Sequence, residues 1–198
     1  YAQAYNNLGN ILKELGRLDE AEASLIQAIE LNPKNVLFYY NLGTIQQQLG
    51  RFAEAESSYR QAIVLKPNFS SAYNNLGSTL KELGRLEQAE ASYRQAIALN
   101  PDYAEAHSNL GNVLQGLDRL EEAETSYRKA IALKPDYVEA KHLLSALTGD
   151  TTRAAPNIYV EKLFDNYASN FESSLVDKLA YKIPRIITKM LIKHHQGR

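Results

Sequence analysis

Residues 70–103 read SSAYNNLGSTLKELGRLEQAEASYRQAIALNPDY, and stretches of the same length and similar sequence occupy 2–35, 36–69 and 104–137. Proline, glycine and alanine columns recur at an interval of 34 residues: Pro33, Pro67, Pro101 and Pro135; Gly9, Gly43, Gly77 and Gly111; Ala21, Ala55, Ala89 and Ala123; Ala28, Ala62, Ala96 and Ala130. Independent columns that keep one period indicate a repeat architecture, in which each unit packs against its neighbours.

Each unit is predicted to form two helices. In the first, Tyr5, Leu8 and Leu12 are apolar at i, i+3 and i+7, so they share one face of a helix. A Gly-Arg pair such as Gly16-Arg17 then ends this helix, and the proline ends the second one. Asp118 stands in place of that glycine in the fourth unit, so we expect a slightly different turn there.

These columns resemble the signature of the tetratricopeptide repeat family, which is an aromatic residue, Leu-Gly, a small alanine, a large apolar residue and a closing proline. The resemblance covers residues 2–137 as four repeats. It implies an all-α, right-handed superhelical solenoid of stacked helix-turn-helix pairs, whose first helices line a concave groove. His107 stands where the other repeats have tyrosine, and we interpret it as a packing residue.

The periodicity fades after residue 137. Residues 138–147 restart a first helix, which predicts a truncated repeat that caps the stack. Residues 148–156 are polar and predict a linker. Residues 157–198 predict a C-terminal helical segment that packs on the end of the array as a cap. At the other end, Tyr1–Ala4 aligns with Tyr103–Ala106, so we expect the chain to begin inside a longer array.

Part of the C-terminal segment resembles the lead-in of bacterial proteins that join such repeats to an S-adenosylmethionine-dependent methyltransferase. The matching residues are Pro156, Tyr159-Val160, Leu163-Phe164-Asp165, Tyr167-Ala168, Phe171-Glu172, Leu179, Tyr181 and Pro184. The resemblance implies a substrate-recruiting or regulatory part of an enzyme whose catalytic domain lies beyond Arg198. Within these 198 residues the glycine-rich turn of such a cofactor site is missing, since Gly197 is the only glycine after Gly149. No catalytic residue, cofactor or metal is predicted for this chain.

The composition limits the classes of partner and of site that we expect for this protein. The 22 basic and 23 acidic residues nearly cancel, which argues against nucleic acid or an anionic membrane. The absence of cysteine excludes disulfides, cysteine-ligated zinc and thiol catalysis. No apolar run approaches the ~20 residues that span a bilayer, and the start does not resemble a signal peptide. We therefore expect a cytoplasmic protein whose partner is another polypeptide.

An asparagine precedes the Leu-Gly pair in every repeat, at Asn7, Asn41, Asn75 and Asn109. We call these four residues the asparagine ladder. Asparagine is a poor helix former, so local stability does not favour it, while its amide offers a donor and an acceptor that match a peptide bond. Packed helices lie ~8–10 Å apart and an extended chain rises ~3.3 Å per residue, so the rungs would meet about every third ligand residue. The ladder therefore predicts a groove that binds an extended peptide.

The ladder resembles the one in the repeats of nucleocytoplasmic sugar transferases. An alternative is that the repeats duplicated recently and copied a solvated asparagine. Asn10 and Asn112 enrich the same helices in amides, and Leu37 and Tyr40 form an apolar pair that either anchors a ligand side chain or contacts the adjacent helix.

The family's clamp for a C-terminal carboxylate is not favoured, because none of the corresponding residues is cationic (Gln3, Leu37, Ser71 and Glu105). A further alternative is a homo-oligomer, in which apolar ends of the array associate.

Overall fold

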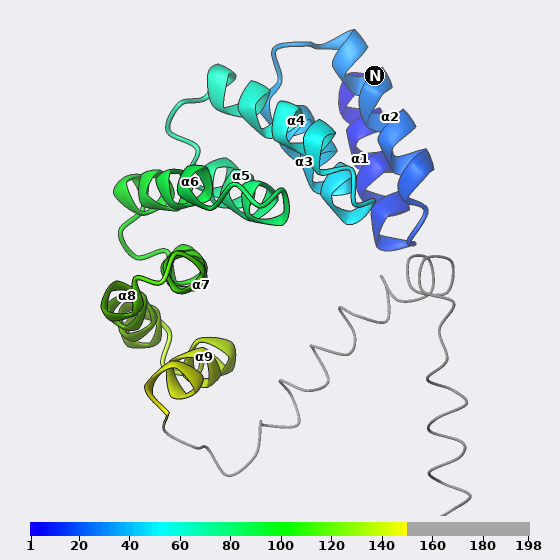
Figure 1. The fold of residues 1–198 in the computed structure, drawn as a ribbon. Coiled ribbons are helices and arrows are strands. Elements are labelled where there is room, and N and C mark those ends of the chain that lie inside the picture. The colour runs from blue at the N-terminus through cyan, green and yellow to red at the C-terminus, as the bar shows by residue number, and fades with distance from the viewer. Residues whose placement is uncertain (150–198) are drawn as a thin grey trace, which may run out of the picture. The chain divides into compact units, whose positions relative to one another are not determined.

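The computed structural model of the protein describes residues 1–149. Within this range the chain forms nine α-helices and no strand, which confirms an all-α repeat fold (Figure 1). The helices are α1 (Ala2–Glu14), α2 (Leu18–Leu31), α3 (Val36–Gln48), α4 (Phe52–Leu65), α5 (Ser70–Glu82), α6 (Leu86–Leu99), α7 (Ala104–Gly116), α8 (Leu120–Leu133) and α9 (Val138–Thr148).

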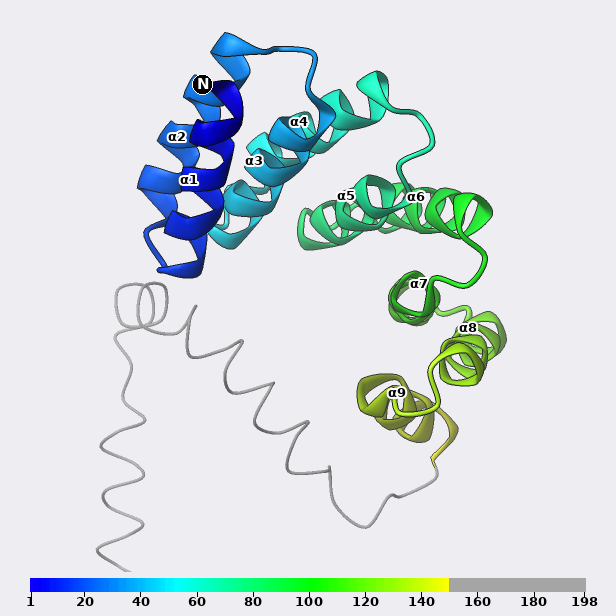
Figure 2. The same ribbon diagram turned by 180° about the vertical axis from the view of Figure 1, so that it is seen from behind.

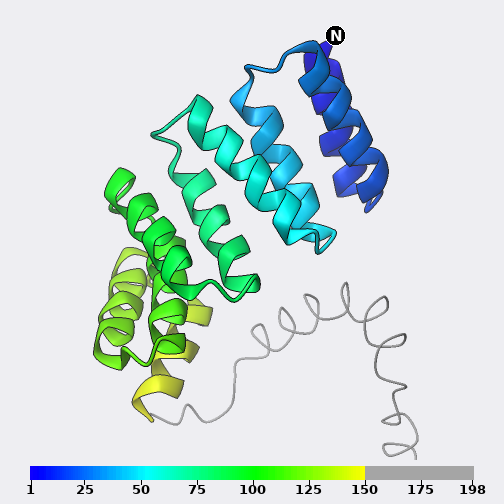
Figure 3. The same cartoon turned by 45° about the horizontal axis from the view of Figure 1, so that its top comes forward.

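The helices stack as pairs. The two helices of each repeat pack against each other, and the second helix of one repeat packs against the first helix of the next. The first helices also touch along the array, from α1 to α3, α3 to α5 and α5 to α7. The pairs follow an arc with these first helices on its inner side, as the two opposite views show (Figures 1 and 2). Figure 3 shows the successive turn of one pair relative to the next.

The glycine of each Leu-Gly pair allows the close approach of the second helix. A Cβ atom at Gly43, Gly77 or Gly111 would lie 2.6–2.9 Å from the ring of the tyrosine opposite it in the same repeat. Real Cβ atoms do not come so near, so the buried rings require glycine. In the first repeat Leu25 replaces the tyrosine, and a Cβ on Gly9 would meet it at 3.1 Å.

The turn inside each repeat uses a left-handed residue. Gly16, Gly50 and Gly84 have φ of 72–73°, and Asp118 has φ of 59° in the fourth repeat. The first and fourth turns also have the same hydrogen bond at equivalent positions. Arg17 N donates to Leu12 O and Arg119 N donates to Leu114 O, both at 2.9 Å. The fourth turn therefore keeps the shape of the others, and Asp118 adopts a conformation that glycine adopts more readily.

The last described helix, α9, packs against α8 and ends at Thr148, with Gly149 as its C-cap at a φ of 75°. Thr148 Oγ1 donates to Leu144 O in the last turn of this helix. The predicted linker beyond residue 149, the helical cap and the methyltransferase-like lead-in at 156–184 lie outside the described residues. None of the helices within 1–149 is both long and apolar enough to cross a membrane.

Candidate functional site

The asparagine ladder lies on the four first helices that form the inner side of the array. Asn7 is exposed on α1, whereas Asn41, Asn75 and Asn109 are only partly exposed. The difference arises because each of the last three has a preceding repeat beside it and Asn7 has none. The predicted site residues therefore share a face but not an environment.

Two rungs are bonded to the repeat before them. Asn41 Nδ2 donates to Asn6 Oδ1 at 2.8 Å, and Asn109 Nδ2 donates to Asn74 Oδ1 at 3.0 Å. Both acceptors are buried, and each lies 35 residues before its donor. The ladder amides thus join successive first helices, a role that the sequence analysis did not consider. The repeated Asn-Asn pairs at 6–7 and 74–75 are the sequence feature that could have indicated these bonds between helices.

The third rung is more heavily committed. Asn75 Nδ2 donates to the hydroxyl of Tyr40 at 3.1 Å and to that of Tyr59 at 3.4 Å. Its Oδ1 accepts a bond from Asn74 Nδ2 at 3.3 Å. Among the described residues these bonds occupy both amide hydrogens and one lone pair, so Asn75 has little left to offer a ligand.

Tyr40 takes the place that Asn6 and Asn74 hold in other repeats. Its ring lies 4.9 Å from that of Phe69 and 5.9 Å from that of Tyr59, centroid to centroid. Burial raises the pKa of the Tyr40 hydroxyl, and the bond from Asn75 partly opposes the rise. Leu37, one turn earlier, is 54% exposed. Of the predicted apolar pair, only Leu37 faces solvent freely, because Tyr40 packs between repeats.

Asn112 is bonded inside its own repeat, where the Tyr127 hydroxyl donates to Asn112 Oδ1 at 2.8 Å. Thr44 and Ser78 occupy the same register and contact the hydroxyls of the equivalent tyrosines at 3.3 and 2.9 Å. In the first repeat Leu25 stands at the register of these tyrosines, so that repeat has no phenol at this position, and Asn10 is partly exposed. The polar residue at this register serves to satisfy a buried hydroxyl.

Those buried tyrosines are weak acids. Burial raises the pKa of Tyr59 to about 12, and it also raises the pKa of Tyr93 and of Tyr127 above the ordinary tyrosine value. Each hydroxyl therefore stays protonated at neutral pH. Those of Tyr59 and Tyr127 donate hydrogen bonds to side-chain oxygens, and that of Tyr59 also accepts one from Asn75.

The inner side carries little net charge. Lys81 lies 3.2 Å from Glu82, its neighbour in the chain. Gln3, at a clamp position, donates to Asn7 Oδ1 at 3.0 Å. Within residues 1–149 no group of histidine and acidic side chains is arranged to hold a metal ion. The ladder residues and the side chains bonded to them are therefore amides and hydroxyls.

A column of ion pairs joins the repeats on the side of the second helices. Arg51 bonds Glu22 at 2.6 Å, Arg85 bonds Glu56 at 2.9 Å, and Arg119 bonds Glu90 at 2.8 Å. In each case the arginine of the Gly-Arg or Asp-Arg turn reaches a glutamate 29 residues earlier. The sequence analysis used these arginines only as turn markers and missed their pairing.

Tandem helix pairs with first helices along one side define a helical-repeat solenoid, a fold suited to protein–protein interaction. Tetratricopeptide repeat profiles match residues 36–69 and 104–137, and also 58–91, and a TPR repeat profile matches 9–50 and 77–118. Because the matched segments together cover residues 9–137, the chain belongs to the tetratricopeptide repeat family.

Solved structures share this fold. A crystal structure of MamA protein is 25% identical with a TM-score of 0.69, over 88% of this chain and 96% of that one. A thermophilic TPR protein of Thermus thermophilus is 26% identical with a TM-score of 0.65, over 96% and 100%. The first TPR of Spaghetti (RPAP3), bound to the HSP90 peptide SRMEEVD, is 27% identical with a TM-score of 0.57, over 58% and 91%. Comparison with curated proteins gave no match.

Proposed function

We propose that the inner side of the array binds an extended segment of another polypeptide through the asparagine ladder. The observation that carries this proposal is the set of ladder amides at the same register of four adjacent first helices, on a wall of neutral polar side chains. Neutral amides match the peptide backbone whatever the ligand's side chains are.

The rungs would contribute unequally. Asn41 and Asn109 each use one amide hydrogen on the preceding repeat, which leaves an oxygen and a second hydrogen for a ligand. Asn7 accepts a bond from Gln3 and keeps both hydrogens. Asn75 is engaged by two tyrosines and by Asn74. We therefore expect a ligand to contact the first, second and fourth rungs and to pass the third with little bonding.

The expected ligand is an uncharged internal segment. The Spaghetti domain holds a peptide that ends in acidic residues, as its sequence SRMEEVD states. In this chain the corresponding clamp positions are Gln3, Leu37, Ser71 and Glu105, and none carries a positive charge. Leu37, with its exposed side chain, offers an apolar contact for one ligand residue.

A selection experiment tests the proposal. Random twelve-residue peptides are selected against the full chain, and the selected peptide is titrated against it and against Asn7→Ala/Asn109→Ala. Each lost bond costs about 0.5–1.5 kcal/mol, so the double variant should bind roughly 5- to 150-fold more weakly. The control is Asn32→Ala/Asn100→Ala, which alters exposed loop residues. Equal affinity of the two variants, both fully helical, would remove the ladder from the binding site.

We propose self-association as a second candidate, because an apolar face of the first repeat is exposed in the described residues. Leu8 is 45% exposed, whereas the equivalent Leu42, Leu76 and Leu110 are 5–8% exposed beneath the preceding repeat. Ile11 and Leu15 continue this face along α1. Sedimentation of the full chain over a range of concentrations should show dimers that Leu8→Lys/Ile11→Lys abolishes. A monomer at every concentration would exclude this candidate.

A further inference from the structure

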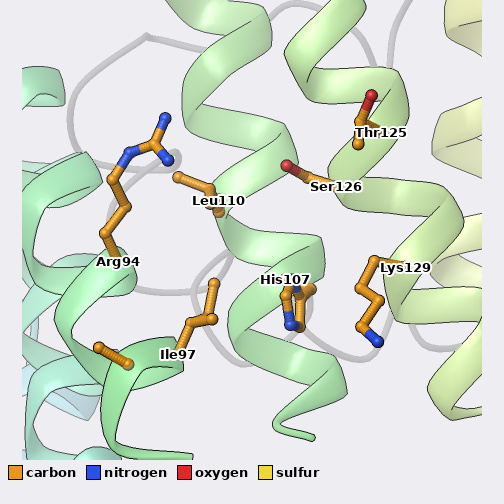
Figure 4. Close-up of a pocket in the computed structure, with 8 residues that line it drawn as sticks. Arg94, Ile97, His107, Leu110, Thr125, Ser126 and Lys129 are labelled. Atoms are coloured by element: carbon orange, nitrogen blue, oxygen red, sulfur yellow. The ribbon is translucent and has the colours of Figure 1, made fainter. Parts of the chain in front are cut away.

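A hollow of about 450 Å³ lies between α6, α7 and α8, away from the asparagine ladder. Ile97 of α6 and Leu110 of α7 form its apolar wall, and His107 stands beside them (Figure 4). Arg94 and Lys129 stand at opposite sides of the hollow in this view. Half of its lining residues are exposed, so the hollow opens to solvent (Arg94, Ala98, Thr125 and Lys129).

The same junction one repeat earlier carries bulkier residues. Between α4, α5 and α6, Val64 and Tyr73 occupy the registers of Ala98 and His107, each 34 residues before its counterpart. The later junction therefore lacks two methyl groups at one position and has an imidazole in place of a phenol at the other. The orientation of the His107 ring is also fixed by a hydrogen bond, since its Nε2 donates to Pro101 O at 3.0 Å.

The charges around the hollow leave one cation available. Arg94 is bonded to Glu90 at 2.8 Å and to Glu122 at 3.2 Å. Thr125 and Ser126 donate their hydroxyls to carbonyl oxygens of their own helix. Lys129 makes no ion pair with any residue between 1 and 149, and it replaces the neutral Gln95 of the preceding repeat.

We propose that this hollow binds an aromatic side chain of a partner polypeptide, with a neighbouring carboxylate of that partner on Lys129. The preceding repeat carries Tyr73 at the register of His107, so a phenol at this position is compatible with the fold, and we infer that the hollow beside His107 accepts one from a partner. The hollow is open to solvent on one side, which leaves room for the peptide backbone that carries the bound side chain. The surface lies apart from the groove of the proposed function, so it adds a second contact.

The test uses the full 198-residue chain and two capped dipeptides, N-acetyl-Asp-Tyr-amide and N-acetyl-Asn-Tyr-amide. Both should shift the nuclear magnetic resonance signals of Ile97, His107 and Leu110, and the aspartyl probe should bind more tightly. The variant Ala98→Val/His107→Tyr installs the residues of the preceding junction. This variant should lower the affinity of both probes at least about tenfold, which is equivalent to 1.4 kcal/mol. Lys129→Gln should make the affinities of the two probes equal, and both probes should still bind.

The outcomes are separable. If the refilled variant binds both probes as the parent chain does, or if the shifts fall elsewhere, the hollow is not the site. If the two probes bind the parent chain equally, Lys129 has no role and the proposal fails in its charged part. His107→Tyr alone serves as the second variant, because Tyr39 and Tyr73 already occupy that register in folded repeats. Circular dichroism at 222 nm checks that each variant keeps its helices.

Discussion

Replacement of Asn109 by alanine should destabilise the array, although asparagine is the poorer helix former. The side chain donates to Asn74 Oδ1 at 3.0 Å, and Asn74 is buried. Without its donor, that oxygen keeps no partner from the next repeat. Asn7 has no repeat before it and is exposed, so Asn7→Ala removes only a surface bond to Gln3. The two substitutions are chemically identical and differ only in this environment.

The magnitude follows from two opposing effects. A buried acceptor left unsatisfied costs about 1–3 kcal/mol. Alanine in place of asparagine returns about 0.5–0.7 kcal/mol of helix propensity. We therefore expect Asn109→Ala to lower the free energy of unfolding by about 0.3–2.5 kcal/mol. For Asn7→Ala we expect no loss, or a small gain from the better helix former.

The assay combines equilibrium unfolding in urea with hydrogen exchange, because repeat arrays lose cooperativity between distant units. Asn109→Ala should accelerate the exchange of backbone amides in α5 and α7 before those in α1. A double-mutant cycle with Asn74→Ala isolates the bond, and its coupling energy should be about 1 kcal/mol. If Asn109→Ala is as stable as Asn7→Ala and the cycle shows no coupling, the ladder does not hold the repeats together.

Three further predictions concern packing, pH and the turns. Gly111→Ala should destabilise the fold by about 1–2 kcal/mol, because the new Cβ would lie 2.6 Å from the Tyr127 ring. Gly9→Ala should destabilise it less, because its Cβ would meet the flexible Leu25 side chain at 3.1 Å, and thermal unfolding of both variants measures the difference. Burial raises the folded-state pKa of Tyr59 from 10 to about 12, so the stability that depends on its protonated hydroxyl is full below pH 10 and is lost as the pH rises toward 12. The melting temperature should therefore fall between about pH 10 and 12, and a smaller fall in Tyr59→Phe would support this. Asp118→Gly should stabilise by about 0.5–1 kcal/mol because φ is 59° there, while Gly84→Ala should destabilise; chemical denaturation that shows the opposite order would contradict the strain at Asp118.

The repeat architecture could be predicted because the same residue types recur at equivalent positions of every repeat. Proline, glycine and alanine recur every 34 residues, and each has a local cause such as helix termination or close packing. The turn at Asp118 could be predicted less well, since the sequence shows the loss of glycine but not whether the backbone keeps its left-handed shape. It keeps that shape, with the same hydrogen bond from Arg119 to Leu114.

The bonding of the candidate site could not be predicted from the register alone. The sequence places Asn41 and Asn109 beside the groove, but their partners lie 35 residues earlier, across a contact between first helices. Whether an amide points to a neighbour or to a ligand depends on side-chain rotamers, which no column of identical residues specifies. Tyr40 shows the same limit, because the sequence left open whether it anchors a ligand or contacts the adjacent helix, and in the structure its hydroxyl accepts a bond from Asn75.

The two kinds of inter-repeat bond lie on opposite sides of each seam and respond to different solvents. Amide bonds join the first helices, while ion pairs such as Arg85 with Glu56 join the second helices. Salt screens exposed charges over ~10 Å at 0.1 M and leaves neutral hydrogen bonds nearly unchanged. The glutamates of these ion pairs are only 11–14% exposed, so high ionic strength should weaken the ion-pair side of each seam in part and leave the amide side nearly unchanged. We therefore expect the curvature of the array to depend on ionic strength.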